Sequence, residues 1–202
     1  MTNYFNEYAG TPQLGVDGDY RCSVHYGNTY RLECAKKQAM LATVSIELII
    51  NHVIEFLKII GIEINDSPIK KSSEINYSKI KKQYNLADER DIVWMKFTTD
   101  GYLGVIATSN DINFDIPTSS EEYDEKEKVY NSYYKKYQYE WKHNTSGILV
   151  HQVDKAWDDT FVLLFPLANI PKEYNRGDIE RAVGNYLIDK GVPIIDFYSH
   201  NY

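Results

Sequence analysis

The stretch DIVWMKFTTDGYLGVIAT, residues 91–108, indicates the fold class more directly than any other part of the chain. It contains two runs rich in β-branched and aromatic residues, at 91–97 and 102–108, separated by a Thr-Asp-Gly turn. Two such runs joined by a short, glycine-containing turn are typical of a β-hairpin. We therefore predict two antiparallel strands over these residues.

Further hairpins are predicted on both sides of this stretch. The run YRCSVHYGNTYRLEC, residues 20–34, has a Gly-Asn turn near its centre. Later in the chain, GILVHQV at 147–153 and TFVLLFPL at 160–167 flank an acidic Trp-Asp-Asp turn at 157–159. A last strand is predicted for VPIIDFY, residues 192–198.

The longest helix is predicted for residues 35–60, with Gly61 as its natural end. Its polar residues are spaced by four, four and three and form one narrow stripe: Glu47, Asn51, Glu55 and Lys58. Because nearly all the other residues are apolar, we expect this helix to be buried on most of its circumference. The segment NDSPIKKS that follows, residues 65–72, is predicted to be a turn.

Three more helices are predicted. One covers residues 73–85, and another follows a capping box and runs from residue 119 to about residue 141. The last begins after Asn175 and ends at Gly191. Its apolar residues recur with helical spacing and define the expected buried face: Ile179, Ala182, Val183, Tyr186 and Leu187.

Hairpins outnumber strand–helix–strand units in this order of elements, which predicts an α+β fold. We expect an antiparallel or mixed sheet built from hairpins, with about four helices packed on it. A chain of 202 residues has about the length of one domain, so residues 1–202 are predicted to form a single α+β domain. Residues 1–19 are expected to be an irregular lead-in, and residues 199–202 a short tail.

Composition excludes several classes of protein. The net charge of −7 disfavours a general nucleic-acid-binding surface, which needs clustered Lys and Arg. The start of the chain lacks the basic residues and apolar run of a secretory signal, and two cysteines are too few for a disulfide scaffold. The apolar stretch 39–60 carries three charged residues, which favours a core helix over a membrane span. We therefore expect a cytoplasmic protein with reduced thiols.

Tyrosine and acidic residues point to a binding surface. The chain has 18 Tyr, a residue that offers a large contact area with few rotatable bonds. Seven acidic residues and one basic residue lie between positions 109 and 127. The alternative is that these acids match the helix dipole and that the tyrosines pack in the core. The expected acidic, tyrosine-rich surface includes Asp111, Asp115, Glu121, Glu122, Glu125, Tyr133 and Tyr139.

Catalytic motifs are missing from the sequence. It has no phosphate-binding or dinucleotide-binding glycine loop, no HExxH, no CxxC and no GxSxG, and we predict no cofactor. The remaining catalytic candidates are carboxylates and imidazoles late in the chain that could hold a divalent cation: His151, Asp158, Asp159, Asp196 and His200. The alternative is that these aspartates are turn residues and that the histidines pack on the sheet or lie in the tail.

Two functions fit the sequence best, beside a metabolic or regulatory domain with an unidentified ligand. The first is a non-enzymatic protein-binding or inhibitor protein, of the immunity or anti-defence type, from a bacterium or phage. Only five of the 22 basic residues are Arg, a bias typical of AT-rich genomes. Its partner is expected to be another protein, with a basic nucleic-acid-processing enzyme as one candidate. We expect no membrane and no direct nucleic-acid binding. The second function is a metal-dependent hydrolase or nuclease that uses the late Asp/His group.

Overall fold

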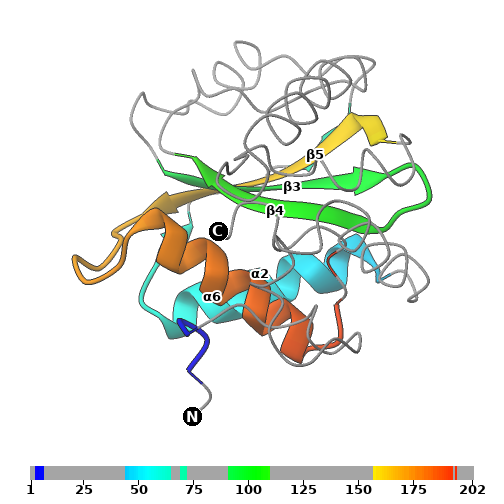
Figure 1. Ribbon diagram of the computed structural model, residues 1–202. Helices are drawn as coiled ribbons and strands as arrows, with labels where there is room; N and C mark the ends of the chain where they lie inside the picture. The colour runs from blue at the N-terminus through cyan, green and yellow to red at the C-terminus, as the bar shows by residue number, and fades with distance from the viewer. Residues whose placement is uncertain are drawn as a thin grey trace, which may run out of the picture.

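The computed structural model contains an antiparallel β-sheet with two helices packed against one of its faces (Figure 1). The hairpin-rich order of the sequence predicts an α+β fold, and the described residues have this class. The elements are α2 (Ile46–Ile59), β1 (Glu63–Ile64), β2 (Ile69–Lys71), β3 (Ile92–Thr98), β4 (Leu103–Ser109), β5 (Trp157–Ala168) and α6 (Arg176–Asp189). The structure describes residues 3–6, 44–64, 69–71, 91–109, 157–192 and 194.

Strands β3 and β4 form the hairpin predicted from residues 91–108. They pair antiparallel, with Trp94 opposite Ala107. At the turn, Gly101 has a φ of +85°, and its amide donates a hydrogen bond to the carbonyl oxygen of Thr98 at 2.9 Å. Glycine adopts this left-handed conformation without steric cost, so the Thr-Asp-Gly sequence closes the hairpin as predicted.

Strand β5 lies between β3 on one side and the short strands β1 and β2 on the other. It begins at Trp157, which pairs with Thr98, so the turn predicted at 157–159 is wrong. The carboxylate of Asp158 accepts hydrogen bonds from the amide and the hydroxyl of Thr160, at 3.0 and 2.6 Å. Pairing with a neighbouring strand therefore outweighs the preference of aspartate for turns.

The turn predicted at 65–72 is also wrong in part, because residues 69–71 form β2. This strand pairs antiparallel with β5, with Ile69 opposite Leu163. The edge of a strand carries backbone donors and acceptors that need hydrogen-bond partners. On the side of β5 away from β3, strand β2 provides these partners. A local composition of Pro, Ser and Lys does not reveal this long-range pairing.

Helix α2 is shorter than the predicted helix 35–60. Ser45 is its N-cap, in an extended conformation, and its hydroxyl oxygen accepts a hydrogen bond from the amide of Leu48 at 3.2 Å. The helix therefore begins one residue after this serine, and residues 35–43 lie outside the described part of the chain. The predicted end is confirmed, since Gly61 has a φ of +78° just after the last turn.

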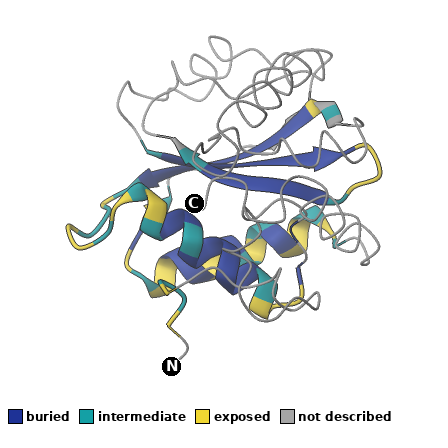
Figure 2. Ribbon diagram, in the orientation of Figure 1, coloured by how far each residue is buried: buried dark blue, intermediate teal, exposed yellow. Residues whose placement is uncertain are grey.

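Helix α2 is also less buried than predicted. Its buried residues form one stripe that faces α6 and the sheet: Ile49, Val53, Phe56 and Leu57. Three large apolar residues on other sides of the helix are exposed: Leu48 at 43%, Ile54 at 37% and Ile59 at 60%. The expectation of burial on most of the circumference is therefore wrong, because the helix packs through a single stripe (Figure 2).

Helix α6 agrees with the prediction at both ends and along its buried face. The side chain of Asn175 accepts a hydrogen bond from the amide of Asp178, and the carboxylate of Asp178 accepts one from the amide of Asn175, both at 3.0 Å. This reciprocal capping box starts the helix, and Gly191, with a φ of +80°, follows its end. The predicted face is buried throughout: Ile179, Ala182, Val183, Tyr186 and Leu187.

The main core lies between the sheet and the two helices. On β3 it takes the alternate residues Val93, Met95 and Phe97. Trp94 and Lys96 alternate with them and so point to the opposite face of the sheet, where they are also buried. The sheet is thus buried on both faces over this strand.

Several predicted elements lie partly or wholly outside the described residues. Of the strand predicted at 192–198, only Val192 and Ile194 are described; both are buried, and neither belongs to a strand. None of the described helices has both the length and the apolar character needed to cross a membrane. Outside the described residues lie the predicted hairpin 20–34, the helices 73–85 and 119–141, and the strand 147–153.

Candidate binding pocket

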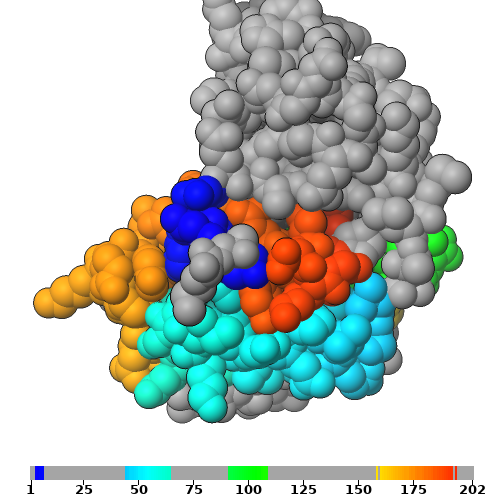
Figure 3. All heavy atoms as spheres, turned by 90° about the horizontal axis from the view of Figure 1, so that it is seen from below, coloured from blue at the N-terminus to red at the C-terminus, as the bar shows by residue number. Residues whose placement is uncertain are grey.

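A pocket of about 780 Å³ opens at the end of the two-helix layer. It is formed by the segment Asn3–Asn6, the last turn of α2, the loop before α6 and the last turn of α6. Figure 3 shows the segment Asn3–Asn6 lying against α6, with α2 alongside. The lining residues are Asn3, Tyr4, Phe5, Glu55, Phe56, Ile59, Ile60, Gly61, Tyr174, Tyr186 and Lys190. We call this site the aromatic pocket.

Five aromatic rings build its walls. Phe56 of α2 stacks on Tyr186 of α6, with ring centroids 4.7 Å apart. The ring of Tyr4 meets both of them edge-on, with centroids 5.5 Å from Phe56 and 5.2 Å from Tyr186. Phe5 stacks on Tyr174 with a centroid distance of 4.4 Å and an angle of 10° between the planes. Such a wall suits a flat or apolar group, which can stack on ring faces or meet ring edges.

Local sequence explains how these rings come together. Phe56 and Tyr186 each belong to the buried stripe of their helix, and the two stripes face each other. The left-handed Gly61 ends α2 and lets the following chain turn away, and a Cβ atom there would meet the ring of Pro171 at 3.8 Å. The loop before α6 therefore passes close to the end of α2 and brings Tyr174 to the pocket.

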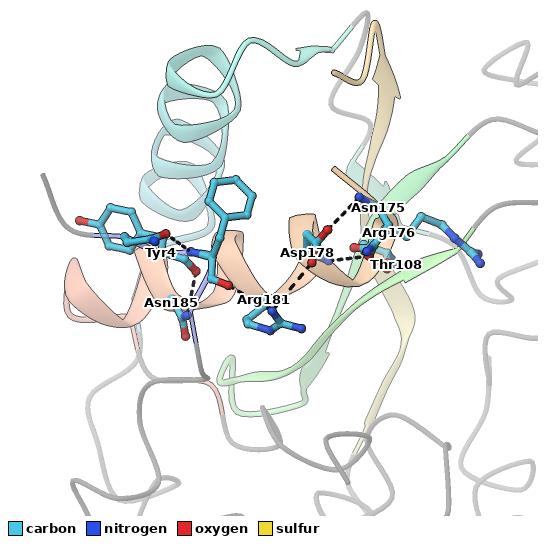
Figure 4. A network of polar contacts seen from close by, with 9 residues as sticks. Tyr4, Thr108, Asn175, Arg176, Asp178, Arg181 and Asn185 are labelled. Carbon is cyan, nitrogen blue, oxygen red and sulfur yellow. Dashed lines mark hydrogen bonds and ion pairs between the residues drawn. The ribbon is translucent and has the colours of Figure 1, made fainter. Parts of the chain in front are cut away.

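A ridge of α6 holds the segment Asn3–Asn6 in place (Figure 4). Asn185 donates from its side-chain amide to the carbonyl oxygen of Tyr4 at 2.9 Å, and Arg181 donates to the carbonyl oxygen of Phe5 at 3.1 Å. Asp189 accepts a hydrogen bond from the hydroxyl of Tyr4 at 2.8 Å. These three residues are four apart and lie along one side of the helix; we call them the α6 ridge.

Two charged side chains, Glu55 and Lys190, line the pocket beside Tyr186. Burial raises the pKa of the Tyr186 phenol, its hydrogen bond with Glu55 raises it further, and Lys190 opposes both effects. The pKa of Lys190 is raised mainly by its hydrogen bond with Tyr186, and its Nζ lies 5.1 Å from the centre of that ring. At neutral pH the pocket therefore presents a neutral phenol and an ammonium group.

A second polar network fixes α6 on the sheet and so positions the α6 ridge. The carboxylate of Glu180, only 5% exposed, accepts hydrogen bonds from the amide and the hydroxyl of Thr108 in β4, at 2.8 and 3.1 Å. The same hydroxyl lies 3.3 Å from the carbonyl oxygen of Arg176. The guanidinium of Arg176 in turn lies 3.9 Å from the carboxylate of Asp91, whose pKa is raised by burial and lowered by this neighbour.

The residues predicted for metal-dependent catalysis are not assembled within the described part of the chain. Asp158 bonds to the neighbouring Thr160, and Asp159 is described only as part of β5. In the described ranges, no group of three or more His, Cys, Asp and Glu side chains could hold a metal ion. The other three candidates, His151, Asp196 and His200, lie outside the described residues.

The predicted acidic, tyrosine-rich surface lies wholly outside the described residues, and its residues are Asp111, Asp115, Glu121, Glu122, Glu125, Tyr133 and Tyr139. The aromatic pocket was missed by the sequence reasoning, which treated residues 1–19 as an irregular lead-in. The available signal was the adjacent pair Tyr4-Phe5 in an otherwise polar segment. Two neighbouring large rings outside a predicted strand or helix need a surface on which to pack.

Comparison of the chain with protein-family models, with curated proteins and with solved structures found no match. We therefore infer the function from the geometry of the described residues and from the composition of the chain.

Proposed function

We propose that the chain is a non-enzymatic protein-binding protein, of the immunity or anti-defence type, that receives an apolar or aromatic side chain of its partner in the aromatic pocket. The observation that supports this most is the pocket itself, in which five rings form part of the lining of a volume of about 780 Å³. This volume falls within the range of about 300–1,000 Å³ that is typical of ligand sites.

The composition of the pocket favours recognition of another protein. Tyr and Phe are enriched in the buried centres of protein interfaces, where one anchoring side chain often supplies much of the binding energy. Ile59 lies at the pocket and is 60% exposed, so a partner that covers it removes apolar surface from water.

Net charge supports a basic partner. At −7 the chain attracts cationic surfaces over distances of about 10 Å at moderate salt. In this proposal the acidic, tyrosine-rich surface predicted from residues 109–141 steers association, and the aromatic pocket anchors the complex. A basic nucleic-acid-processing enzyme fits such a surface.

The test is capture of a partner from the native host by three forms of the chain: wild type, Ile59→Gln and Leu48→Gln. Both substitutions replace an exposed apolar residue of α2 with a good helix former, but only Ile59 lines the pocket. We expect one stoichiometric protein with wild type and Leu48→Gln, and much less of it with Ile59→Gln. Equal capture by all three forms would contradict a role for the pocket.

Among the described residues, no arrangement favours the metal-dependent hydrolase. Asp158 is the one candidate of that group whose side chain is described, and its carboxylate is engaged by Thr160.

A further inference from the structure

The segment Asn3–Asn6 lies on α6 in the way that a bound peptide lies on a receptor. Two consecutive carbonyl oxygens, of Tyr4 and Phe5, accept hydrogen bonds from Asn185 and Arg181. Side chains that bind successive backbone carbonyls hold a peptide backbone whatever its sequence, and pockets for the side chains then select the sequence.

The side chains of this segment also contact α2, α6 and the loop before α6. The ring of Tyr4 lies against Phe56 and Tyr186, and its hydroxyl reaches Asp189 beyond them. The ring of Phe5 stacks on Tyr174. The first position therefore suits a hydroxyl-bearing ring, and the second position suits a plain aromatic ring.

We propose that the α6 ridge and the rings of Phe56, Tyr174 and Tyr186 form a peptide-recognition site. The chain's own Tyr4-Phe5 pair occupies this site, as a displaceable part of the pocket wall, until a partner replaces it. The partner element is a turn that carries a tyrosine followed by a second aromatic residue, because Tyr4 and Phe5 lie in a turn closed by a hydrogen bond from the amide of Asn6 to the carbonyl oxygen of Asn3 at 3.4 Å. This inference rests on the proposed binding function and names the chemistry that the site recognises.

Attachment of the segment to the chain lowers the apparent affinity for an external peptide. A tethered segment competes at an effective concentration in the millimolar range, so an external peptide binds wild type more weakly than it binds a chain whose own pair is removed. The apparent dissociation constant scales inversely with the fraction of molecules whose site is open.

The test measures binding of a fluorescein-labelled peptide, MTNYFNEY, to the full 202-residue chain by fluorescence polarisation. The chains are wild type and the double variant Tyr4→Ala/Phe5→Ala, with far-UV circular dichroism to verify folding. We expect saturable binding to the double variant that is at least about tenfold tighter than to wild type. A peptide with both aromatic residues replaced by alanine should not bind.

Matched variants test whether the peptide binds to the α6 ridge or to any apolar surface of the chain. In the double-variant background, Asn185→Ala should weaken peptide binding by about two- to tenfold, the value of one hydrogen bond, whereas Asn51→Ala on α2 should leave it unchanged. If the double variant does not fold, Tyr4→Phe replaces it, because this change removes only the hydroxyl that bonds to Asp189. We then expect binding about two- to tenfold tighter than to wild type.

The proposal is overturned if a folded double variant, or Tyr4→Phe in its place, binds the peptide no more tightly than wild type, or if the alanine peptide binds equally well. Partner capture distinguishes this outcome from a failure of the proposed function. If Tyr4 and Phe5 are a fixed wall of the pocket, their replacement reduces capture of the partner; if they are a displaceable occupant, it increases capture. Capture that is insensitive to Ile59→Gln contradicts the proposed function itself.

Discussion

Thr108 and Glu180 illustrate how one buried carboxylate fixes the position of a helix. Replacing Thr108 with Val keeps the shape of the side chain but removes the hydroxyl that donates to Glu180 at 3.1 Å. Hydrogen bonds to charged groups contribute about 1.5–3 kcal/mol, so we expect Thr108→Val to lower the free energy of unfolding by about this amount. Urea denaturation followed by circular dichroism measures the change.

Thr108→Ser is the matched control for this substitution, because it retains the hydroxyl and loses only a methyl group. It should recover more than half of the stability lost in Thr108→Val. Equal losses in the two variants would mean that packing of the methyl group, and not the hydrogen bond, holds Thr108 in place.

Asp91 predicts a dependence of stability on pH. Burial raises the pKa of this carboxyl group, and the guanidinium of Arg176 opposes the shift. A carboxyl group with a raised pKa binds its proton more tightly in the folded state, so its contribution to stability is greatest below its unfolded pKa. That contribution is lost as the pH rises through the folded pKa. Relative to Asp91→Asn, wild type should therefore lose stability as the pH rises from the ordinary pKa of aspartate through the raised value.

The measurement for Asp91 is urea unfolding of both chains at a series of pH values. The difference between them should change in the window that starts at the ordinary pKa of aspartate, about 4, and extends upward to the raised value. A difference that stays constant would show that pairing with Arg176 balances burial, and a change in favour of wild type with rising pH would show that the pairing outweighs it; either result contradicts the prediction.

At the scale of elements, the capping box makes a direct prediction for α6. Asn175→Ala removes the acceptor for the amide of Asp178 and should destabilise the protein by about 1 kcal/mol. Asn175→Asp retains an acceptor at the N-cap and should cost less than half as much. Thermal unfolding of the two variants checks this order, and equal destabilisation would contradict a capping role.

Local patterns predicted those elements whose signals are themselves local. Helix α6 has an N-cap, a helical stripe and a terminating glycine in its own sequence, and the β3–β4 hairpin has a turn of its own. Helix α2 was predicted too long, because the apolar composition before Ser45 concealed the capping serine. Its burial was also overestimated, since an apolar residue such as Ile59 can remain on the surface.

Elements that depend on distant partners were predicted poorly. Strand β2 directly follows the turn-forming residues 65–68, and β5 begins with Trp157 and two aspartates. Both are strands because β2 pairs with β5 and the start of β5 pairs with β3. The aromatic pocket was missed for the same reason. The position of Tyr4 and Phe5 depends on hydrogen bonds with the α6 ridge, which join residues more than 170 positions apart in the chain. Tyr186 was predicted as a buried residue, but its place in a pocket depends on α2.

For the molecule as a whole, the charge distribution should govern the rate of association. Reversal of Glu121, Glu122 and Glu125 to Lys weakens the attraction of a basic partner, so the association rate constant should fall by about tenfold at low salt. The fold should be unaffected, as judged by circular dichroism. Surface plasmon resonance against the captured partner measures the rate, and an unchanged association rate would remove these acids from the proposed steering surface.

The proposed function depends on the aromatic pocket anchoring a protein partner. Its most direct test is the dissociation constant of the captured partner for wild type, Ile59→Gln and Leu48→Gln, measured by titration calorimetry. Loss of an anchoring contact at an interface costs more than about 1 kcal/mol. We predict that Ile59→Gln weakens binding by about tenfold or more, while Leu48→Gln stays within about twofold of wild type. Equal dissociation constants for all three chains would contradict the claim.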